Sequence, residues 1–513
     1  MKRIFLLLFS VGTFLQAQEY AYDAVLWQKS IGGEHAEYLY HALATPDYGF
    51  LLLGSSVSDA TGQKNKANQG KLDYFVWKID EAGKQEWQQS FGGDENDFLT
   101  AGALTKDGGY ILGGYSESSE SGDKTTKSFG LADYWVLKLD AAGNIQWQKT
   151  IGGYGNDELI SIIQTQDGGY LLAGNSDSPK SDLKSENSFG GKDYWIVKLD
   201  PKGEIIWDKT LGGEYTEEVK AIYETKDGFV LFGQTNSPEN EKFNDFDWEV
   251  ILLSKTGELQ AAMRYGNEND DILNSVYFDK ENEIFFLAGV SQNQNQRKLS
   301  IISLDTHLNQ LKETSTEIDS HQIINSLLMT KQGDYLLAGS NLGYTKTKNG
   351  EQKPSSAYNS FILNQYGEEK WTKTLKSDGF DYLQIAIETR DGSVVLIGNS
   401  DASNSADKEI ASNGQQDFWM VKLGNKQTQE ETDRTYIEAY PNPTRDYVNI
   451  LINQEFEKAS GKVINLNGQQ LQEFTIHYRT TPVDLRHYPS GVYIIQLQID
   501  NQIESINILK SNL

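Results

Sequence analysis

The sequence predicts an all-β protein: a seven-bladed β-propeller followed by a small antiparallel β-sandwich. The first observation is a repeat, in which Trp27, Trp87, Trp147 and Trp207 open the phrases WQKSIGG, WQQSFGG, WQKTIGG and WDKTLGG at sixty-residue intervals. A fixed period indicates one supersecondary unit built many times and stacked. The second observation is the composition, because 11% aromatic residues and 47 Gly against 9 Pro suit short strands joined by tight turns.

Each repeat contains four predicted strands. In the clearest copy, residues 156–213, the strands are expected at 159–163, 170–174, 193–200 and 205–210, with turns at 166–169 and 201–203. Four antiparallel strands at even spacing are typical of a propeller blade. The recurring Trp residues are expected to pack one blade against the next; a stacking platform for a sugar or a cofactor is the alternative.

The phase of the repeats predicts how the array closes. Degenerate copies bring the number of blades to about seven, from residue 18 to residue 423. The array begins with a fourth strand, residues 25–31, and ends with a third strand, residues 418–423. The N-terminal strand would therefore complete the last blade and hide the sheet edges. An open solenoid of the same strands is the alternative.

The N-terminus predicts the cellular location, and the net charge and the absence of Cys exclude some classes of function. Lys2 and Arg3 precede an apolar run, and Ala17 offers a small residue for cleavage, so residues 1–17 are predicted to be a secretory signal peptide. A buried N-terminal strand is the alternative, and no other segment is apolar enough for a membrane span. The formal net charge of −27 argues against nucleic acid, and the absence of Cys removes disulfides and thiolate chemistry.

A second domain is expected after a polar linker at residues 424–435. Residues 436–513 contain short alternating strands with the composition of a small antiparallel sandwich. Its characteristic residues are Tyr440, Pro441, Asn442, Pro443, Gly468, Gly491, Tyr493 and Lys510.

In the order and terminal position of these motifs, residues 436–513 resemble the type A C-terminal sorting domain of the type IX secretion system of Bacteroidetes-type bacteria. The resemblance implies export through the inner membrane by the signal peptide, then transport across the outer membrane by the type IX machinery, and a passenger that is secreted or held at the cell surface. In that family the sorting domain is commonly removed. The alternative is a carbohydrate-binding sandwich. The repeats resemble uncharacterised DGGY-type propeller arrays, which implies no known activity.

A carboxylate recurs after each fourth strand, and these residues form the candidate binding site. They are Glu37, Asp97, Asp157, Glu217, Asp271, Asp319 and Asp381. In a propeller they would form a ring near one mouth of the central channel, where Ca²⁺ finds hard oxygen ligands. The alternative is that each one accepts backbone N–H groups and fixes its own turn.

Calcium is the one cofactor that this pattern suggests, with Asp94, Asp97, Asp270 and Asp271 as candidate ligands. Long polar loops at 116–132, 175–192 and 399–416 are expected on the same face, where loops on a rigid scaffold usually carry function.

Motifs for catalysis are scarce. The six His residues include no HExxH pair, and no nucleophile elbow or phosphate-binding Gly motif is present. The sequence therefore predicts a binding or adhesion module for an extracellular glycan or protein rather than an enzyme. A glycan hydrolase or lyase and a structural protein of the cell envelope are the alternatives.

Overall fold

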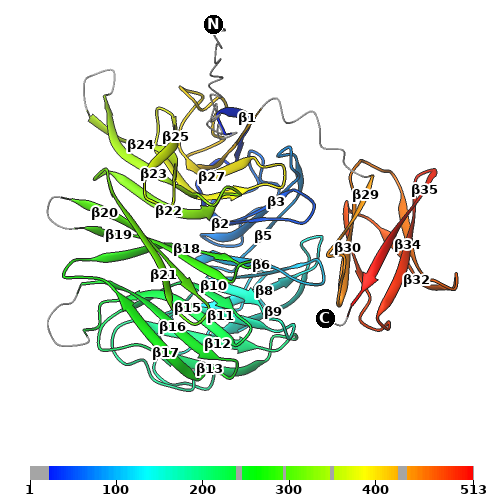
Figure 1. The fold of residues 1–513 in the computed structure, drawn as a ribbon, viewed down its shortest axis with the longest axis horizontal. Helices are drawn as coiled ribbons and strands as arrows, with labels where there is room; N and C mark the ends of the chain where they lie inside the picture. Colours follow the sequence, from blue (N-terminus) through cyan, green and yellow to red (C-terminus); the bar gives the residue numbers. More distant parts are fainter. Residues whose placement is uncertain (1–21, 239–244, 293–295, 347–351, 426–435, 512–513) are drawn as a thin grey trace, which may run out of the picture.

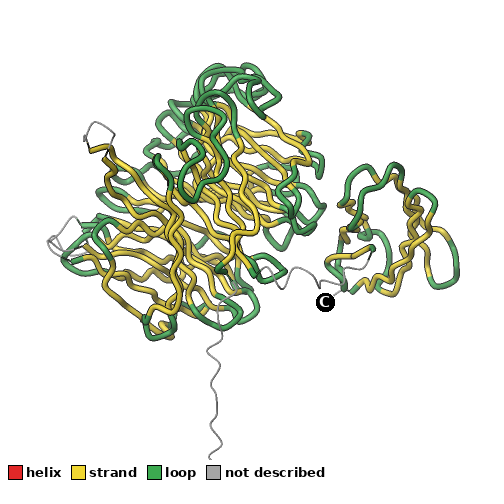
Figure 2. The backbone as a smooth tube through the Cα atoms, turned by 90° about the horizontal axis from the view of Figure 1, so that it is seen from above, coloured by secondary structure: helices red, strands yellow, loops and turns green. Residues whose placement is uncertain are grey.

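The computed structural model describes residues 22–238, 245–292, 296–346, 352–425 and 436–511. All regular structure in these residues is β-strand, so the predicted all-β class is confirmed (Figure 2). The predicted signal peptide and residues 426–435 of the predicted linker lie outside the described residues. Gly424 was expected to open the linker but is the last residue of a paired strand.

Residues 24–424 form seven four-stranded antiparallel sheets, here called the seven-sheet unit (Figure 1). Six sheets use four consecutive strands each. The first three are β2 (Glu37–Ala44), β3 (Phe50–Ser56), β4 (Asp73–Ile79) and β5 (Gln85–Phe91); β6 (Asp97–Leu104), β7 (Tyr110–Ser116), β8 (Asp133–Leu139) and β9 (Ile145–Ile151); and β10 (Asp157–Gln164), β11 (Tyr170–Ser176), β12 (Asp193–Leu199) and β13 (Ile205–Leu211). The next three are β14 (Glu217–Glu224), β15 (Gly228–Thr235), β16 (Asp247–Ser254) and β17 (Leu259–Tyr265); β18 (Asp271–Asp279), β19 (Ile284–Gln292), β20 (Arg297–Asp305) and β21 (Gln310–Ile318); and β22 (Gln322–Met329), β23 (Tyr335–Lys346), β24 (Gln352–Leu363) and β25 (Glu369–Lys376).

The seventh sheet joins the two ends of the repeat array. It contains β26 (Asp381–Glu388), β27 (Val394–Ser400), β28 (Asp417–Gly424) and β1 (Ala24–Ile31), and β1 pairs antiparallel with β28. This is the pairing that the strand phase predicted. The first strands of neighbouring sheets contact one another in the order β2, β6, β10, β14, β18, β22 and β26, and β26 contacts β2.

The core lies between neighbouring sheets. Second and third strands such as β7, β8, β11 and β12 are buried almost throughout, which explains their nearly continuous apolar sequences. Aromatic pairs cross each boundary: the Trp135 ring lies 4.7 Å from the Tyr74 ring of the preceding sheet, and the Tyr74 hydroxyl donates to the Trp135 carbonyl at 2.9 Å. Trp135 and its counterparts Trp195 and Trp419 are fully buried, so these tryptophans pack sheet against sheet.

The C-terminal unit has two further sheets (Figure 1). One contains β29 (Ile437–Tyr440), β30 (Tyr447–Ile452) and β33 (Thr480–Asp484), and the other β31 (Ala459–Asn465), β32 (Gln470–Ile476), β34 (Gly491–Ile499) and β35 (Gln502–Lys510). Their inward side chains, including Val448, Ile450, Val463 and Ile495, form one buried cluster. The unit therefore has a hydrophobic core of its own.

Candidate functional site

Six of the seven predicted carboxylates occupy one position of the repeat. Glu37, Asp97, Asp157, Glu217, Asp271 and Asp381 are the first residues of β2, β6, β10, β14, β18 and β26, and all six are buried. Asp97 accepts the Gly93 N–H at 2.7 Å and the Ser118 hydroxyl at 3.0 Å. Asp157 accepts the Gly153 N–H at 2.6 Å. Each carboxylate thus fixes the turn that precedes its strand.

Asp319 does not belong to this set. The first residue of β22 is Gln322, which is buried, whereas Asp319 lies in the preceding turn, is largely exposed and accepts the His321 N–H at 2.7 Å. The two positions differ because only three residues, 319–321, separate β21 from β22, whereas five residues, 92–96, separate β5 from β6.

Carboxylates of neighbouring sheets meet in pairs. The third strands β4, β8, β12 and β28 begin with a buried Asp: Asp73, Asp133, Asp193 and Asp417. At Gly212 an added Cβ would lie 2.0 Å from Asp193 Oδ1 and 2.4 Å from Glu217 Oε2. The first Gly of the repeated Gly-Gly pair therefore leaves room for two carboxylates, and we call each such place a carboxylate seam.

Proton affinity is unusual at these seams. Burial, reinforced by the facing carboxylate, raises the pKa of Asp73, Asp133 and Asp193 to about 6. Burial also raises the pKa of Asp97 and Asp157. The Oδ1 atoms of Asp73, Asp97, Asp133 and Asp157 have no hydrogen-bond partner among the described residues. Protonation of one carboxyl group of a seam removes the repulsion between its two charges.

Four buried lysines accompany the seams: Lys64, Lys124, Lys184 and Lys408. Lys124 donates to the Ser118 carbonyl at 2.6 Å and to the Ser128 hydroxyl at 2.6 Å. Burial lowers the pKa of Lys124, while Asp133 and Asp97 act in the opposite direction. Their spacing was a signal in the sequence, because Lys64, Lys124 and Lys184 share the sixty-residue period, yet they lie inside loops that look solvated.

The calcium prediction gains no support from the placement of its residues. Within the described ranges, no group of three or more His, Asp or Glu side chains is arranged to hold a metal ion. Asp94 is exposed and accepts hydroxyls of Ser119 and Ser121, at 2.9 Å and 2.8 Å. Asp270 accepts the Phe246 N–H at 3.1 Å, and Asp97 and Asp271 fix their own turns.

A cavity of about 720 Å³ lies between the first strands of all seven sheets. Each of these strands carries a β-bulge at the same place, and the bulged residues line the cavity. They are Tyr40, Thr100, Ile160, Lys220, Asn274, Asn325 and Gln384. No Asp or Glu is among the described residues that line it. β-Bulges often change the direction of side chains next to binding or active sites.

Three aromatic residues, here called the aromatic arc, share one position of the repeat, and one of them contacts the cavity wall: the Tyr382 hydroxyl donates to Asn325 Oδ1 at 3.4 Å. The second residue of each first strand is on the same side as the bulged residue two positions later, because side chains alternate along a strand. On the three neighbouring strands β26, β2 and β6 this residue is Tyr382, Tyr38 and Phe98, which are half-buried or exposed. Phe98 stacks on Tyr115 with 4.7 Å between ring centroids. The corresponding Glu158 and Glu218 are engaged by Lys192 and Gln234, each at 2.8 Å.

Further apolar side chains are exposed in the connections at the same end of the sheets. Tyr154 is 67% exposed where the other repeats have Glu34, Asp94 and Glu214. Phe129, Leu131 and Phe189 in the neighbouring long loops are also exposed. Because the repeat is otherwise polar here, these side chains distinguish two adjacent sheets from the rest.

In the C-terminal unit, the predicted motif residues join the two ends of the domain. Asn442 donates to the Asn507 carbonyl at 2.8 Å and accepts the Leu509 N–H at 2.9 Å. Lys510 is buried and donates to the Arg445 carbonyl at 2.9 Å. The remaining residues also have defined places. Tyr440 is the last residue of β29 and is 55% exposed, and Pro441 follows it. Pro443 precedes Thr444, Gly468 lies in the turn after β31, and Gly491 and Tyr493 lie at the start of β34.

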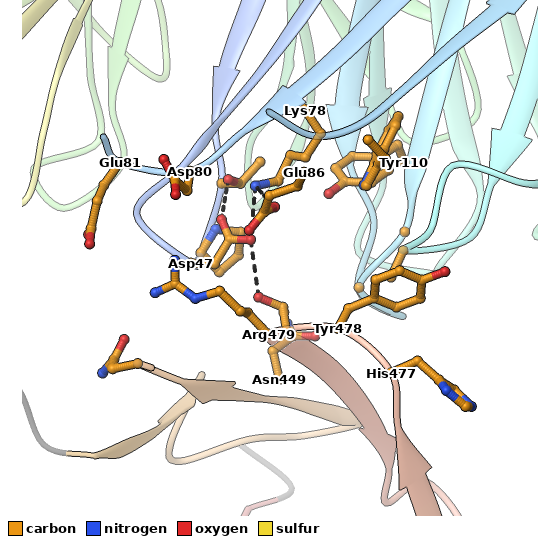
Figure 3. A pocket seen from close by; sticks show the side chains of 18 of the residues that line it. Asp47, Lys78, Asp80, Glu81, Glu86, Tyr110, Asn449, His477, Tyr478 and Arg479 are labelled. Atoms are coloured by element: carbon orange, nitrogen blue, oxygen red, sulfur yellow. Dashed lines mark hydrogen bonds and ion pairs between the residues drawn. The ribbon is translucent and has the colours of Figure 1, made fainter. Parts of the chain in front are cut away.

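A second cavity, of about 520 Å³, lies between the two units (Figure 3). Asp47 and Tyr110 come from the seven-sheet unit, and Asn449 and Arg479 face them from the C-terminal unit. The Lys78 ammonium is paired with Asp47 at 2.9 Å and with Glu86 at 2.7 Å. Nothing in the sequence pointed to this cleft, because its walls belong to two domains.

Comparison with known proteins identifies the C-terminal unit. Residues 438–510 match the family of secretion system C-terminal sorting domains. The chain is 27% identical over 231 residues to the regulatory protein FlaEY of Caulobacter vibrioides, a match that covers 42% of this chain and 22% of that relative. The chain therefore spans about a fifth of the length of this curated relative.

Solved structures show more distant likeness. A subtype N10 neuraminidase-like protein of A/little yellow-shouldered bat/Guatemala/060/2010 is 8% identical, with 63% of this chain and 92% of that chain covered and a TM-score of 0.36. A Synechocystis apocarotenoid oxygenase mutant is 10% identical, with 79% and 95% covered and a TM-score of 0.36. A Pseudomonas brassicacearum lignostilbene dioxygenase is 11% identical, with 75% and 92% covered and a TM-score of 0.36. These values carry no functional argument.

The C-terminal unit is thus a sorting domain, the class that its motifs indicated. The sorting domain marks the protein as an exported passenger of the type IX secretion system, secreted or located at the cell surface. None of the described elements is a helix with the length and apolarity of a membrane span.

Proposed function

We propose that the protein is an extracellular binding module in which the seven sheets are the blades of a closed β-propeller and the sorting domain is a β-sandwich. The pairing of β1 with β28 and the contact of β26 with β2 support closure of the ring. The buried cluster common to both C-terminal sheets supports the sandwich. In this arrangement the cavity of about 720 Å³ is the central channel.

The ligand that this site fits best is a glycan. The observation that carries the proposal is the arc of Tyr382, Tyr38 and Phe98 at the channel mouth. Aromatic rings with a polar edge offer flat apolar area together with hydrogen-bonding groups, and pockets of 300–1,000 Å³ with a few polar groups are typical of ligand sites. Asn274, Asn325 and Gln384 supply amide groups to the channel wall.

Binding fits this site better than hydrolysis. A glycoside hydrolase uses two carboxyl groups that flank the scissile bond. The carboxyl groups with raised pKa, such as Asp133, are buried in the seams and do not line the cavity. At the mouth, Glu158 is held by Lys192 and Glu218 by Gln234. The carboxylates predicted from the sequence would then organise the mouth rather than touch the ligand.

The double substitution Tyr38→Ala with Tyr382→Ala tests the proposal. We expect it to weaken glycan binding at least tenfold, because truncating an aromatic residue that is central to a binding site typically costs about 2 kcal/mol or more of binding free energy. The measurement is a glycan array with the full chain, followed by titration calorimetry on the best glycan. Tyr366, which is 74% exposed in the turn between β24 and β25, provides the matched control Tyr366→Ala.

Three outcomes of this experiment distinguish the possible functions. Binding lost in the double variant but kept in Tyr366→Ala supports the mouth as the site. If the double variant and Tyr366→Ala bind the glycan with the same affinity, the glycan binds elsewhere on the protein. Release of shorter oligosaccharides during incubation would replace the binding proposal by a hydrolase or lyase.

A further inference from the structure

One turn of the seven-sheet unit departs from its repeat in a way that its own sheet does not explain. Five of the seven connections between first and second strands share one turn, in which the N–H of the fourth residue donates to the carbonyl of the first. Its fourth residue has positive φ and is Gly108, Gly168, Gly333 or Gly392 in four sheets, at 78°, 86°, 81° and 74°. In the turn between β2 and β3 this residue is Tyr48, at 64°. A bulky side chain is disfavoured in this region, whereas Gly is not.

The Tyr48 side chain reaches the sorting domain. Its hydroxyl donates to Glu438 Oε2 at 2.8 Å, and Glu438 is the second residue of β29. The Arg390 guanidinium, from the turn between β26 and β27, lies 4.6 Å from the Tyr48 ring and 5.3 Å from the Tyr440 ring. Arg390 Nη1 is also 3.8 Å from Glu438 Oε2. One tyrosine and one arginine thus hold the start of the sorting domain.

Neighbouring turns extend the same contact. Asp47 accepts the Thr480 hydroxyl at 3.2 Å, and Figure 3 shows Asp47 facing the Asn449 and Arg479 side of the sorting domain. At Gly108 an added Cβ would lie 2.7 Å from Asn449 Oδ1 and 2.9 Å from Pro482 Cβ. Lys84 and Glu455 form an exposed ion pair at 2.8 Å. Three consecutive sheets therefore contact the sorting domain through their turns.

We propose that these turns are a docking site for the chain's own sorting domain, and that the two domains stay bound after the chain between them is cut. A disfavoured backbone conformation persists where another interaction compensates for it, and it marks functional positions. Here the compensating interaction is the contact of Tyr48 and Arg390 with Glu438 and Tyr440. The contact lies at the ends of the sheets opposite the aromatic arc, so it leaves the channel mouth open.

The test uses the full chain with a protease recognition site introduced between residues 426 and 435. After cutting, the two fragments are expected to elute together in size-exclusion chromatography at 0.1 M salt and to separate as salt is raised, because Debye screening weakens exposed charge contacts. Separate elution of the wild-type fragments at low salt would overturn the proposal.

The variant Tyr48→Gly separates docking from folding. Gly suits the turn, so we expect the seven-sheet unit to melt at the same or a higher temperature while the cut fragments no longer elute together. Tyr366→Ala is the matched control, since Tyr366 is also an exposed turn tyrosine with a cation, Lys312, 5.0 Å from its ring. Co-elution of the cut Tyr48→Gly fragments at wild-type strength would overturn the role of this contact.

Discussion

Replacing Lys124 with methionine should destabilise the seven-sheet unit by about 3–5 kcal/mol at pH 8, the usual consequence of removing one partner from a buried charge pair. Lys124 is 1% exposed, and the negative charges of Asp133 and Asp97 favour its ammonium form. Methionine fills a similar volume but leaves both carboxylates buried without their cation. Urea denaturation at pH 8 measures the loss.

The pH dependence of this loss identifies its cause. Below pH 6 Asp133 takes up a proton, since its pKa in the folded protein is about 6. The carboxyl group then needs no cation, so the deficit of Lys124→Met should shrink at pH 5. Lys127→Met is the control, because Lys127 is exposed in the same loop. This substitution should change the free energy of unfolding by at most about 0.5 kcal/mol. An equal deficit at both pH values would mean that lost packing, and not charge, explains the effect.

The number and order of the four-stranded sheets could be predicted because the sequence features that define them recur in the repeat. Nearly continuous apolar second strands, Asp-Gly turns and the phase of the N-terminal strand are local features, and each is repeated several times in the sequence. The same repetition placed Asp97 and Asp157 at one position, where they begin β6 and β10. Before β22 the connection has only three residues, so the spacing used for the other repeats led to Asp319 instead of Gln322.

The surroundings of the carboxylates could not be predicted in the same way. Asp133 faces Asp157 because β8 and β10 lie in neighbouring sheets that pack together, a relation that sequence spacing does not encode. The side of β2 on which the aromatic side chain lies depends on strand alternation: Tyr38 follows Glu37, so these two side chains lie on opposite sides of β2. The contact of Tyr48 with Glu438 joins two domains, so no repeat could reveal it.

The substitution Asp133→Asn should stabilise the protein at pH 8, by about 1–3 kcal/mol. The folded-state pKa of Asp133 is about 6, above the usual value of 3.8 for an aspartate. Between these two values the folded protein holds a proton that the unfolded chain has released, so the stability associated with Asp133 falls as pH rises from about 4 to about 6. Asparagine resembles the protonated form at every pH, because its amide group can donate to Asp157 while its oxygen accepts the Phe129 N–H that Asp133 now accepts at 2.7 Å.

The measurement is the free energy of unfolding of Asp133→Asn and wild type from pH 4 to pH 8. We expect the two curves to meet near pH 4 and to separate as pH rises, with the variant more stable. Asp182→Asn, at an exposed position in an equivalent loop, should follow the wild-type curve. The double variant Lys124→Met with Asp133→Asn should lose less stability at pH 8 than Lys124→Met alone, because one buried charge has gone with the cation. If Asp133→Asn is instead less stable than wild type at pH 8, Lys124 stabilises the ionised Asp133 carboxylate, and the raised pKa of Asp133 is wrong.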